Sequence, residues 1–375
     1  MIYLDNAATG RFKPECVFAA MARQLRFAAN PGRSGHFASL YAAKKVEEAR
    51  ENLKKLFSAP EDAQLIFTCN CTEALNYAIL GWLQDKSGSV VCTAFDHNSV
   101  LRPLNALKKR GLEVKVVFPR KSGELAAADI AAAISEDTRL VVVTHASNVT
   151  GRVVNVEAVG RECERRGVPL LLDCAQSAGH YEVNMQKSKA AFICCAGHKG
   201  LHAPQGSGFL IVRAGLELKP LKFGGTGTNS LSLEMPSLLP EALEAGTLNT
   251  PAIDGLNAGA QWTHERFLEI NAAIGGFCAL LRGRLEKCAR LKIYSPEGSH
   301  LFAFALEGIA STDVADALSE SGIAVRGGLH CAPLMHAALG TLDDGLVRIS
   351  PGADNTLEQA ERTAKAILRI AGSAV

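Results

Sequence analysis

Lys199 and Asp173 are the two side chains whose types and positions most directly suggest chemistry. Lys199 lies in the turn Gly197-His198-Lys199-Gly200, directly after the apolar residues 190–195, and Asp173 directly follows the apolar residues 169–172. A lysine amine can form a Schiff base, and an acid can hold a pyridine nitrogen protonated. The pair therefore indicates a pyridoxal phosphate site and chemistry on amino acids.

Short β-rich runs alternate with helical stretches and would position these side chains. The runs cover residues 64–67, 89–93, 113–118, 140–144, 169–172, 191–195 and 207–212. Residues 41–57 place apolar side chains at helical spacing, which predicts an amphipathic helix. This alternation predicts an α/β fold with a mostly parallel, seven-stranded sheet covered by helices on both faces.

A smaller α+β unit is expected after the glycine-rich residues 223–228. Its elements are a helical bridge, three strands and a closing helix, over residues 253–289, 300–306, 325–328, 346–350 and 356–370. We therefore expect a large cofactor-binding domain of residues 14–255 and a small domain of residues 1–13 and 256–375.

Polar residues follow the predicted strands at the sheet edge where open α/β folds bind ligands. Thr72 opens a helix whose first amides suit a phosphate, although this segment taken alone favours a plain helix cap. His97 is placed to lie flat on a pyridine ring, or it is a solvated loop residue. Asn148 is placed to reach a cofactor oxygen or a substrate carboxylate, or it belongs to an ordinary turn.

Burial strengthens the interpretation of Asp173 and Lys199. An acid directly after three leucines is unpaired unless a cation meets it, and a pyridinium N–H is such a partner. Gln176, three residues later, can hydrogen-bond the phenolic oxygen of the same ring. A buried lysine has a lowered pKa and becomes a nucleophilic amine.

Composition and charge exclude several classes of partner. Forty basic and 38 acidic residues leave a net charge of +2 without a basic block, so we expect no nucleic-acid partner. No apolar stretch approaches the roughly 20 residues needed to cross a bilayer, and the first residues do not resemble a signal peptide.

Eleven cysteines, mostly inside apolar runs and without Cys-x-x-Cys spacing, fit a reducing compartment rather than a metal site. We expect a cytoplasmic protein.

Several motifs, in order and spacing, resemble the class V, fold-type I pyridoxal phosphate enzymes, and among these the cysteine desulfurases. The resemblance runs nearly end to end. The motifs are Leu4-Asp5-Asn6-Ala7-Ala8-Thr9, Asn30-Pro31-Gly32-Arg33-Ser34-Gly35-His36, Cys71-Thr72-Glu73-Ala74-Leu75-Asn76, Asp96-His97-Asn98-Ser99-Val100, His145-Ala146-Ser147-Asn148, Asp173-Cys174-Ala175-Gln176, Gly197-His198-Lys199 and Glu244-Ala245-Gly246-Thr247.

The resemblance implies a role for each site residue. Lys199 would carry the Schiff base, Asp173 would pair with the pyridinium, Gln176 would contact the phenolic oxygen, and His97 would stack on the ring. Thr72, His198 and the Cys71 backbone amide would hold the phosphate, joined by Thr247 of the other protomer of a homodimer. The sequence departs from the family at Ala196, where a serine or threonine hydroxyl usually bonds the phosphate.

The segment Val325-Arg326-Gly327-Gly328-Leu329-His330-Cys331-Ala332-Pro333 resembles the short catalytic loop of type II cysteine desulfurases, with Cys331 as the sulfur acceptor. The alternative is that Cys331 is a small buried hydrophobe. Its glycine- and histidine-rich surroundings instead predict an accessible loop, where a nearby imidazolium would favour the thiolate. Arg348, together with Asn148, would bind the substrate carboxylate; the alternative for Arg348 is a surface salt bridge.

These residues predict a cysteine desulfurase that converts L-cysteine to L-alanine and leaves a persulfide on Cys331 for an acceptor protein. Three alternatives share most of the residues. They are a selenocysteine lyase acting on L-selenocysteine, a class V aminotransferase in which Cys331 is incidental, and a protein that holds pyridoxal phosphate without catalysis. The sequence does not distinguish sulfur from selenium and does not identify the acceptor.

Overall fold

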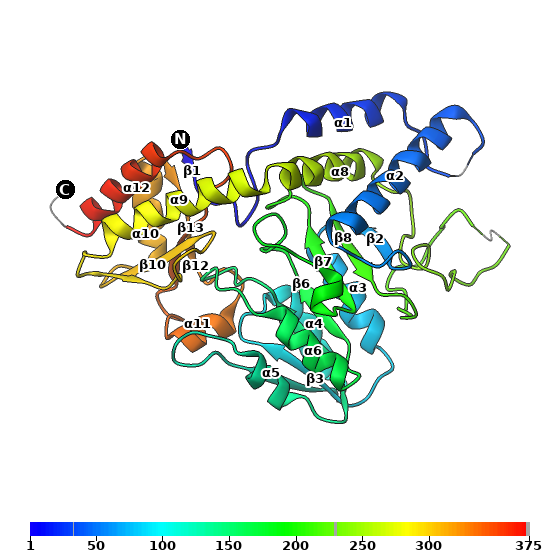
Figure 1. The fold of residues 1–375 in the computed structure, drawn as a ribbon, viewed down its shortest axis with the longest axis horizontal. Helices are drawn as coiled ribbons and strands as arrows, with labels where there is room; N and C mark the ends of the chain where they lie inside the picture. The colour runs from blue at the N-terminus through cyan, green and yellow to red at the C-terminus, as the bar shows by residue number, and fades with distance from the viewer. Residues whose placement is uncertain (33, 229–230, 373–375) are drawn as a thin grey trace.

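A computed structural model describes residues 1–32, 34–228 and 231–372 of the chain. Arg33, in the second of the motifs above, lies outside the described residues. The described chain forms a seven-stranded sheet, a four-stranded sheet and a two-stranded pairing, with helices around them (Figure 1). The predicted α/β class and the smaller C-terminal α+β unit are thereby confirmed.

The large sheet is mixed but mostly parallel. Within the described residues its strands run in the order β2 (Gln64–Thr68), β8 (Gly208–Val212), β7 (Phe192–Ala196), β6 (Leu170–Asp173), β5 (Thr138–Thr144), β3 (Ser89–Thr93) and β4 (Glu113–Val117). Neighbours from β7 to β4 are parallel, whereas β8 is antiparallel to both β7 and β2. Every strand expected in this half of the chain is present, with ends shifted by at most two residues.

Helices cover both faces of the large sheet because its strands are apolar on both sides. Along β3, Val90 and Cys92 enter one hydrophobic cluster and Val91 enters the other, as the two-residue period of a strand requires. One face carries α3 (Cys71–Leu83) and α4 (Asn98–Lys108). The other carries α2 (Phe37–Leu56), α5 (Ala127–Ala133), α6 (Val156–Arg165) and α7 (Met185–Ser188).

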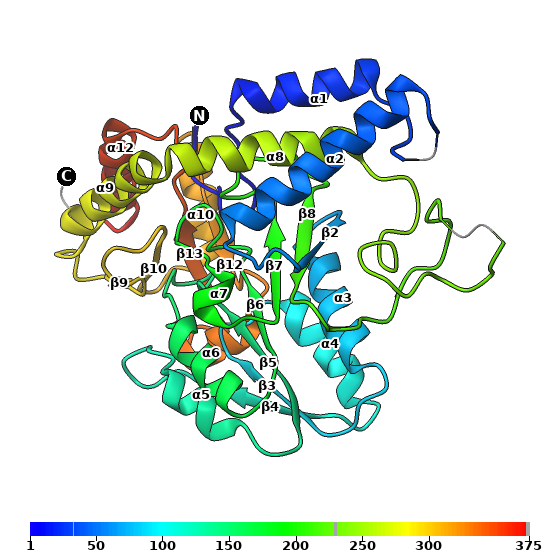
Figure 2. The same ribbon diagram turned by 45° about the vertical axis from the view of Figure 1, so that its right-hand side comes forward.

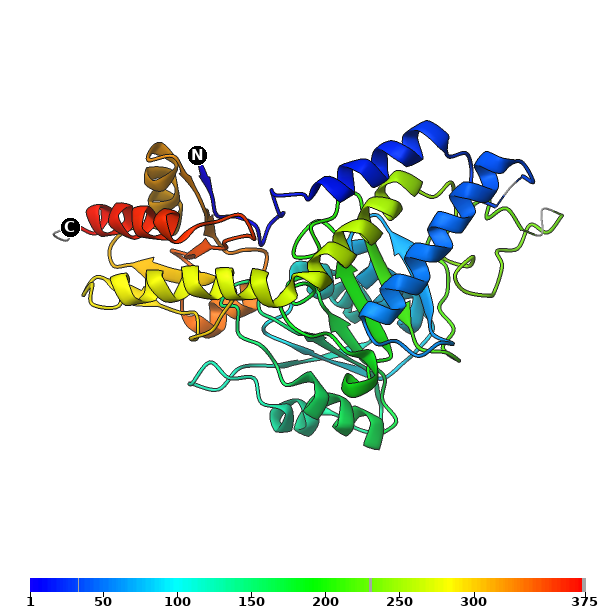
Figure 3. The same cartoon turned by 45° about the horizontal axis from the view of Figure 1, so that its top comes forward.

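Two helices in nearly continuous line carry the chain from the large sheet to the small one. These helices are α8 (Thr250–Glu265) and α9 (Phe267–Leu285). A third helix, α1 (Glu15–Phe27), packs along α8 (Figure 3) and was not predicted from the sequence. Between β8 and α8, the described residues 213–228 and 231–249 contain no helix or strand. Part of this segment extends away from the body of the molecule (Figure 2).

The small sheet is antiparallel and joins the two ends of the chain. Its described strands run in the order β12 (Arg326–Gly328), β13 (Leu346–Ile349), β10 (Phe302–Leu306) and β9 (Leu291–Ile293). Beside it, β1 (Ile2–Tyr3) pairs in parallel with β11 (Ile323–Ala324). The helices α10 (Ser311–Glu320), α11 (Pro333–Leu339) and α12 (Leu357–Ile370) complete this unit. The N-terminal strand thus lies among C-terminal elements, while the domain boundaries stay a prediction.

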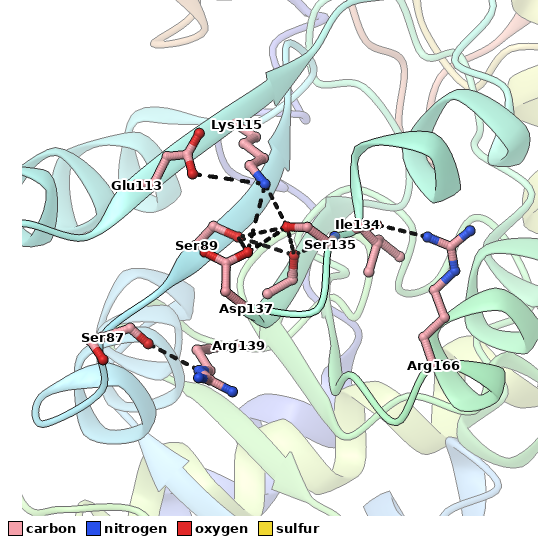
Figure 4. Close-up of polar contacts among 10 residues, drawn as sticks. Ser87, Ser89, Glu113, Lys115, Ile134, Ser135, Asp137, Arg139 and Arg166 are labelled. Atoms are coloured by element: carbon pink, nitrogen blue, oxygen red, sulfur yellow. Dashed lines mark hydrogen bonds and ion pairs between the residues drawn. The ribbon is translucent and has the colours of Figure 1, made fainter.

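A network of hydroxyl groups ties together the amino ends of three strands (Figure 4). Ser135 lies before β5, and its hydroxyl accepts from Lys115 Nζ at 2.6 Å and donates to Asp137 at 2.5 Å. Ser89, at the start of β3, also donates to Asp137, at 3.2 Å. These polar groups bond to one another, which leaves the opposite, carboxyl edge of the sheet for the candidate site.

Among the described residues, no helix is both long and apolar enough to cross a membrane.

Candidate active site

A cavity lies at the carboxyl edge of the large sheet, where the turns after β2, β3, β5, β6 and β7 converge. It is lined by Asn70, Cys71, Thr72, Leu75, His97, Ser99, Thr144, Asn148, Asp173, Ala175, Gln176, Ala196, His198 and Lys199. Eight of the eleven residues assigned to the site from the sequence are therefore brought together here. Of the other three, Arg348 and Cys331 lie beside the cavity. Thr247 lies in a different hollow.

Lys199 is the partly buried amine of the cavity. It follows β7 in a turn whose backbone is held on both sides: Gly10 N donates to His198 O at 2.8 Å, and His202 N donates to Lys199 O at 3.0 Å. Burial lowers the pKa of Lys199, against the opposing effects of Cys71 and Asp173. The lowered pKa increases the fraction of neutral amine, which is the nucleophilic form.

Asp173 ends β6 and directs a carboxylate into the same cavity. Its Oδ1 accepts from Ala175 N at 2.9 Å and from Cys71 Sγ at 3.5 Å. Burial raises the pKa of Cys71 well above its ordinary value, which keeps this thiol protonated and able to donate. No described residue donates to Oδ2, so one carboxylate oxygen stays available to a cationic group of a ligand.

His97, Ser99 and Thr72 form a hydrogen-bonded group between the first turns of α3 and α4. His97 caps α4, and its Nδ1 accepts from Ser99 N at 3.0 Å. The Ser99 hydroxyl lies 3.0 Å from the same Nδ1 and 2.8 Å from the Thr72 hydroxyl. Burial lowers the pKa of His97. Because a backbone N–H can only donate, Nδ1 is unprotonated and the neutral ring carries its hydrogen on Nε2.

Arg348 is fully buried on β13, which overturns the alternative of a surface salt bridge. Its Nη2 donates to Asp5 Oδ1 at 2.9 Å and its Nη1 donates to Asn148 O at 2.9 Å. Among the described residues, Nε of Arg348 and Oδ1 of Asn148 are buried without a partner. The guanidinium therefore keeps a donor for an anionic ligand.

Cys331 lies on an exposed loop at the rim of the cavity. His330 and Cys331 have φ angles of 50° and 57°, a left-handed conformation that is uncommon for residues other than glycine. The loop is held by two bonds to the cavity walls: Asn98 N donates to Cys331 O at 2.8 Å, and Asn148 Nδ2 donates to His330 O at 2.6 Å. The predicted accessible loop is confirmed.

The expected imidazolium beside Cys331 is wrong. Burial lowers the pKa of His330 to about 2 and also lowers the pKa of His336, so both rings are neutral near pH 7. A positive charge near the loop comes instead from Arg348, which interacts electrostatically with Cys331. The positive charge that acts on Cys331 is therefore the guanidinium of Arg348, and the two neighbouring histidines are neutral.

Gln176 and His198 line the cavity but already bond to the N-terminal segment. Gln176 Nε2 donates to Ala7 O at 2.9 Å, and Nδ1 of His198 lies 3.1 Å from the Thr9 hydroxyl. Burial lowers the pKa of His198 to about 4, so this ring is also neutral. An amide nitrogen carries two hydrogens, so Gln176 retains one donor for a ligand.

Ala196 and Thr247 are the two predicted phosphate-site positions that give no hydroxyl to the cavity of their own chain. Ala196 is buried in the cavity wall and supplies no hydroxyl there. Thr247 lies away from this cavity, in a different hollow that it shares with Cys69, Glu73 and Lys222. Within one chain, therefore, Thr247 does not reach the lysine.

All eleven cysteines are free thiols, and no cluster of metal ligands occurs among the described residues. Eight cysteines are buried, as small apolar side chains often are. Cys69, in the turn after β2, is exposed instead.

Sequence reasoning missed Asp5 and Ser99, which bond directly to predicted site residues. Both stand inside the motifs quoted above, but neither type nor position pointed to a partner. For Asp5 a physical signal did exist, because a buried arginine needs an acid to offset its charge. The acid could not be identified from the sequence, because 343 residues separate it from Arg348.

Comparison with known proteins places this fold in one class of α/β enzyme. The apo structure of a cysteine desulfurase from Thermococcus onnurineus matches with a TM-score of 0.91 and 30% identity, covering 99% of this chain and 94% of that one. A cysteine desulfurase structure from Escherichia coli matches with a TM-score of 0.87 and 26% identity, covering 98% and 94%.

The profile of the aminotransferase class-V family matches residues 2–363, and the chain belongs to this family. A probable cysteine desulfurase of Methanothermobacter thermautotrophicus is 35% identical over 99% of this chain and 95% of its own length. A probable cysteine desulfurase of Pyrococcus abyssi is 34% identical over 96% and 92%. The predicted membership of the cysteine desulfurase group is confirmed.

Proposed function

We propose that this enzyme is a pyridoxal phosphate-dependent cysteine desulfurase that converts L-cysteine to L-alanine and collects the sulfur on Cys331. The observation that carries the proposal is the placement of Cys331. Its loop is exposed, yet it is bonded through Asn98 and Asn148 to the walls of the cavity that holds Lys199. A thiol at this position can meet the sulfur of a substrate bound next to the amine.

The residues of the cavity fit pyridoxal phosphate. A partly buried amine of lowered pKa suits its aldehyde, and the free Oδ2 of Asp173 suits its ring nitrogen. The first turn of α3, with the Thr72 hydroxyl, suits its phosphate. When bound, this cofactor supplies the aldehyde that captures amino groups and a ring that accepts the electron pair left on Cα.

The chain's own groups then have defined tasks. The N–H groups of Arg348 bind the substrate carboxylate, and Asn148 supports them. The Lys199 amine takes the Cα proton. The Cys331 thiolate attacks the substrate sulfur, so that an S–S bond forms while the C–S bond breaks. The electron pair of the broken bond stays with the carbon skeleton, which is protonated and leaves as alanine.

Two features support a homodimer with composite sites. Thr247, whose family counterpart serves the phosphate, lies outside the cavity of its own chain. Large apolar side chains are also exposed on the segment between β8 and α8, at Phe223, Leu231, Leu233 and Leu238. In the proposed dimer, Thr247 of the partner subunit completes the phosphate site. Sedimentation equilibrium of the holoenzyme tests this, since a monomeric mass at working concentration would contradict it.

The deciding experiment is mass spectrometry after borohydride treatment and, separately, after L-cysteine. We expect a pyridoxyl label on Lys199, one persulfide sulfur on Cys331, and stoichiometric alanine. Cys331→Ala should retain the label and lose the persulfide, whereas Cys69→Ala, a matched change of another exposed cysteine, should retain both. Transfer of the amino group to a keto acid without persulfide would instead identify an aminotransferase.

The same variants distinguish sulfur from selenium. Alanine release from L-cysteine and from L-selenocysteine is measured for wild type and for Cys331→Ala. Retained activity on L-selenocysteine with lost activity on L-cysteine favours the selenocysteine lyase. We further expect a sulfur-acceptor protein that removes the persulfide from the exposed Cys331 loop. Faster alanine release on addition of the correct acceptor is the measurement that identifies it.

A further inference from the structure

Ser99 contacts two residues expected to hold the cofactor, yet the function proposed above gives it no task. Its hydroxyl lies 2.8 Å from that of Thr72 and 3.0 Å from Nδ1 of His97. It lines the same cavity as both of them and as Ala196. The hydroxyl stands between the first turns of α3 and α4, two helices that pack against each other.

The direction of these hydrogen bonds follows from the number of donors and lone pairs. Nδ1 of a neutral imidazole has one lone pair, and the backbone N–H of Ser99 already donates to it at 3.0 Å. The Ser99 hydroxyl therefore donates its hydrogen to the Thr72 hydroxyl oxygen rather than to Nδ1. Among the described residues, Thr72 Oγ1 has no other hydrogen-bond partner than Ser99.

A donated hydrogen from Ser99 changes what Thr72 can do. Because the Thr72 oxygen accepts from Ser99, its own hydrogen is free to point into the cavity. Hydrogen bonds in a chain polarise one another, so this arrangement also makes Thr72 a stronger donor toward an anion. The arrangement bears on Ala196, because this position of the cavity lining lacks the hydroxyl that a serine or threonine would supply.

We propose that Ser99 is a positioning residue of the phosphate site: its hydroxyl donates to Thr72 and so orients the Thr72 hydroxyl toward the cofactor phosphate. Its backbone N–H, at the same time, holds His97 with its hydrogen on Nε2. One residue thereby joins the phosphate end of the cavity to the histidine expected against the ring. This inference rests on pyridoxal phosphate being the cofactor.

The test compares pyridoxal phosphate with pyridoxal, which lacks the phosphate, in equilibrium titrations of the full-length apoprotein. Ser99→Ala should weaken pyridoxal phosphate binding by about 3- to 10-fold, the effect of one net hydrogen bond. Pyridoxal binding should stay within about twofold of wild type, the scatter found for independent sites. Ser99→Thr, which keeps the hydroxyl, should restore most of the lost affinity.

A double-mutant cycle with Thr72→Ala distinguishes positioning from direct contact. If Ser99 acts through Thr72, then Ser99→Ala costs no further affinity in the Thr72→Ala protein. Ser321→Ala removes an exposed hydroxyl that bonds a backbone carbonyl in α10, and it should change neither titration. Thermal unfolding of each apoprotein checks that the variants fold alike.

The outcomes separate this inference from the function on which it rests. Additive losses in the cycle, or equal weakening of pyridoxal and pyridoxal phosphate, would overturn the role of Ser99 alone. If wild type binds pyridoxal phosphate no better than pyridoxal and borohydride leaves Lys199 unlabelled, both the role of Ser99 and the proposed cofactor are wrong.

Discussion

At the scale of single residues, the site is defined by how its buried charges are partnered. Arg348 is fully buried, and among the described residues Asp5 is the one carboxylate that bonds its guanidinium. An unpaired buried charge is costly, so the acid is a structural requirement of the arginine. The sequence contains both residues, but their pairing requires the N-terminal segment to lie beside the end of β13, where Asp5 pairs with Ser350. No local sequence pattern encodes that contact.

Replacing Asp5 with asparagine should therefore destabilise the protein. Breaking a buried pair costs about 3 to 5 kcal/mol, and we expect the lower end because the Asp5 side chain is 22% exposed. The measurement is the free energy of unfolding from urea denaturation of the apoprotein. Asp129→Asn breaks the exposed pair with Arg120 and should cost about 1 kcal/mol or less. Equal losses in the two variants would contradict the importance of burial.

At the scale of elements, the strands of the large sheet were predictable, whereas the short strands β1, β9 and β11 and the helix α1 were not. The runs that form β3 and β5 are apolar on both faces, which is the signature of a central parallel strand. By contrast α1 has an exposed face that still carries Phe18 and Leu25, so its pattern lacks a clear polar side. The residues after each strand were predictable because parallel strands bring their carboxyl ends together.

A buried ion pair fastens the long segment between β8 and α8 to the large sheet. Glu244 accepts from both terminal nitrogens of Arg50 on α2 at 3.1 Å, and from Phe67 N on β2 at 2.7 Å. Both side chains are less than a tenth exposed. The segment carries Thr247, so this pair also determines where that residue is presented to a partner subunit.

Glu244→Gln should lower the free energy of unfolding by about 3 kcal/mol, because the buried guanidinium loses its charged partner. Arg50 also pairs with Glu47, which is 63% exposed, at 3.4 Å. Glu47→Gln is thus a matched change at the same arginine, and it should cost less than about 1 kcal/mol. Urea denaturation of both proteins measures the difference, and a Glu244→Gln protein as stable as wild type would refute the role assigned to the pair.

Close packing of α6 on α7 leads to a prediction against ordinary helix propensity. A Cβ added at Gly160 would collide with the backbone carbonyl of Ser188. Alanine in place of glycine inside a helix usually stabilises by about 1 kcal/mol. Here Gly160→Ala should instead lower the thermal unfolding temperature, while Gly283→Ala in α9, where a Cβ meets open space, should raise or maintain it. A rise in both variants would show that α7 moves aside at little cost.

At the scale of the whole molecule, two units meet at one site, and this meeting was the least predictable feature. The N-terminal segment starts beside the small sheet and passes the cavity, where Asp5, Ala7 and Thr9 bond Arg348, Gln176 and His198. Sequence patterns identify elements and the edge at which ligands bind. They do not specify which side chains from distant segments are brought into hydrogen-bond contact, because that depends on packing between the units.

The buried histidines make the folded molecule sensitive to acid. Burial lowers the pKa of His202 to about 3 and that of His330 to about 2, whereas an unfolded histidine titrates near 6.5. Below pH 6.5 these histidines bind protons in the unfolded chain but stay neutral in the folded chain. The stability contributed by each neutral ring is thus complete above pH 6.5 and declines as the pH falls, by at most about 1.4 kcal/mol per pH unit.

Urea denaturation of the apoprotein at a series of pH values between 7.5 and 4.5 measures this slope. His202→Gln should reduce the slope by the share of one histidine, although loss of the bond between His202 and Thr263 at 2.9 Å lowers stability at every pH. His264→Gln, a change of the exposed histidine two residues after Trp262, is the matched control. If His202→Gln and wild type show the same slope, His202 is protonated in the folded protein and its burial does not cause the acid sensitivity.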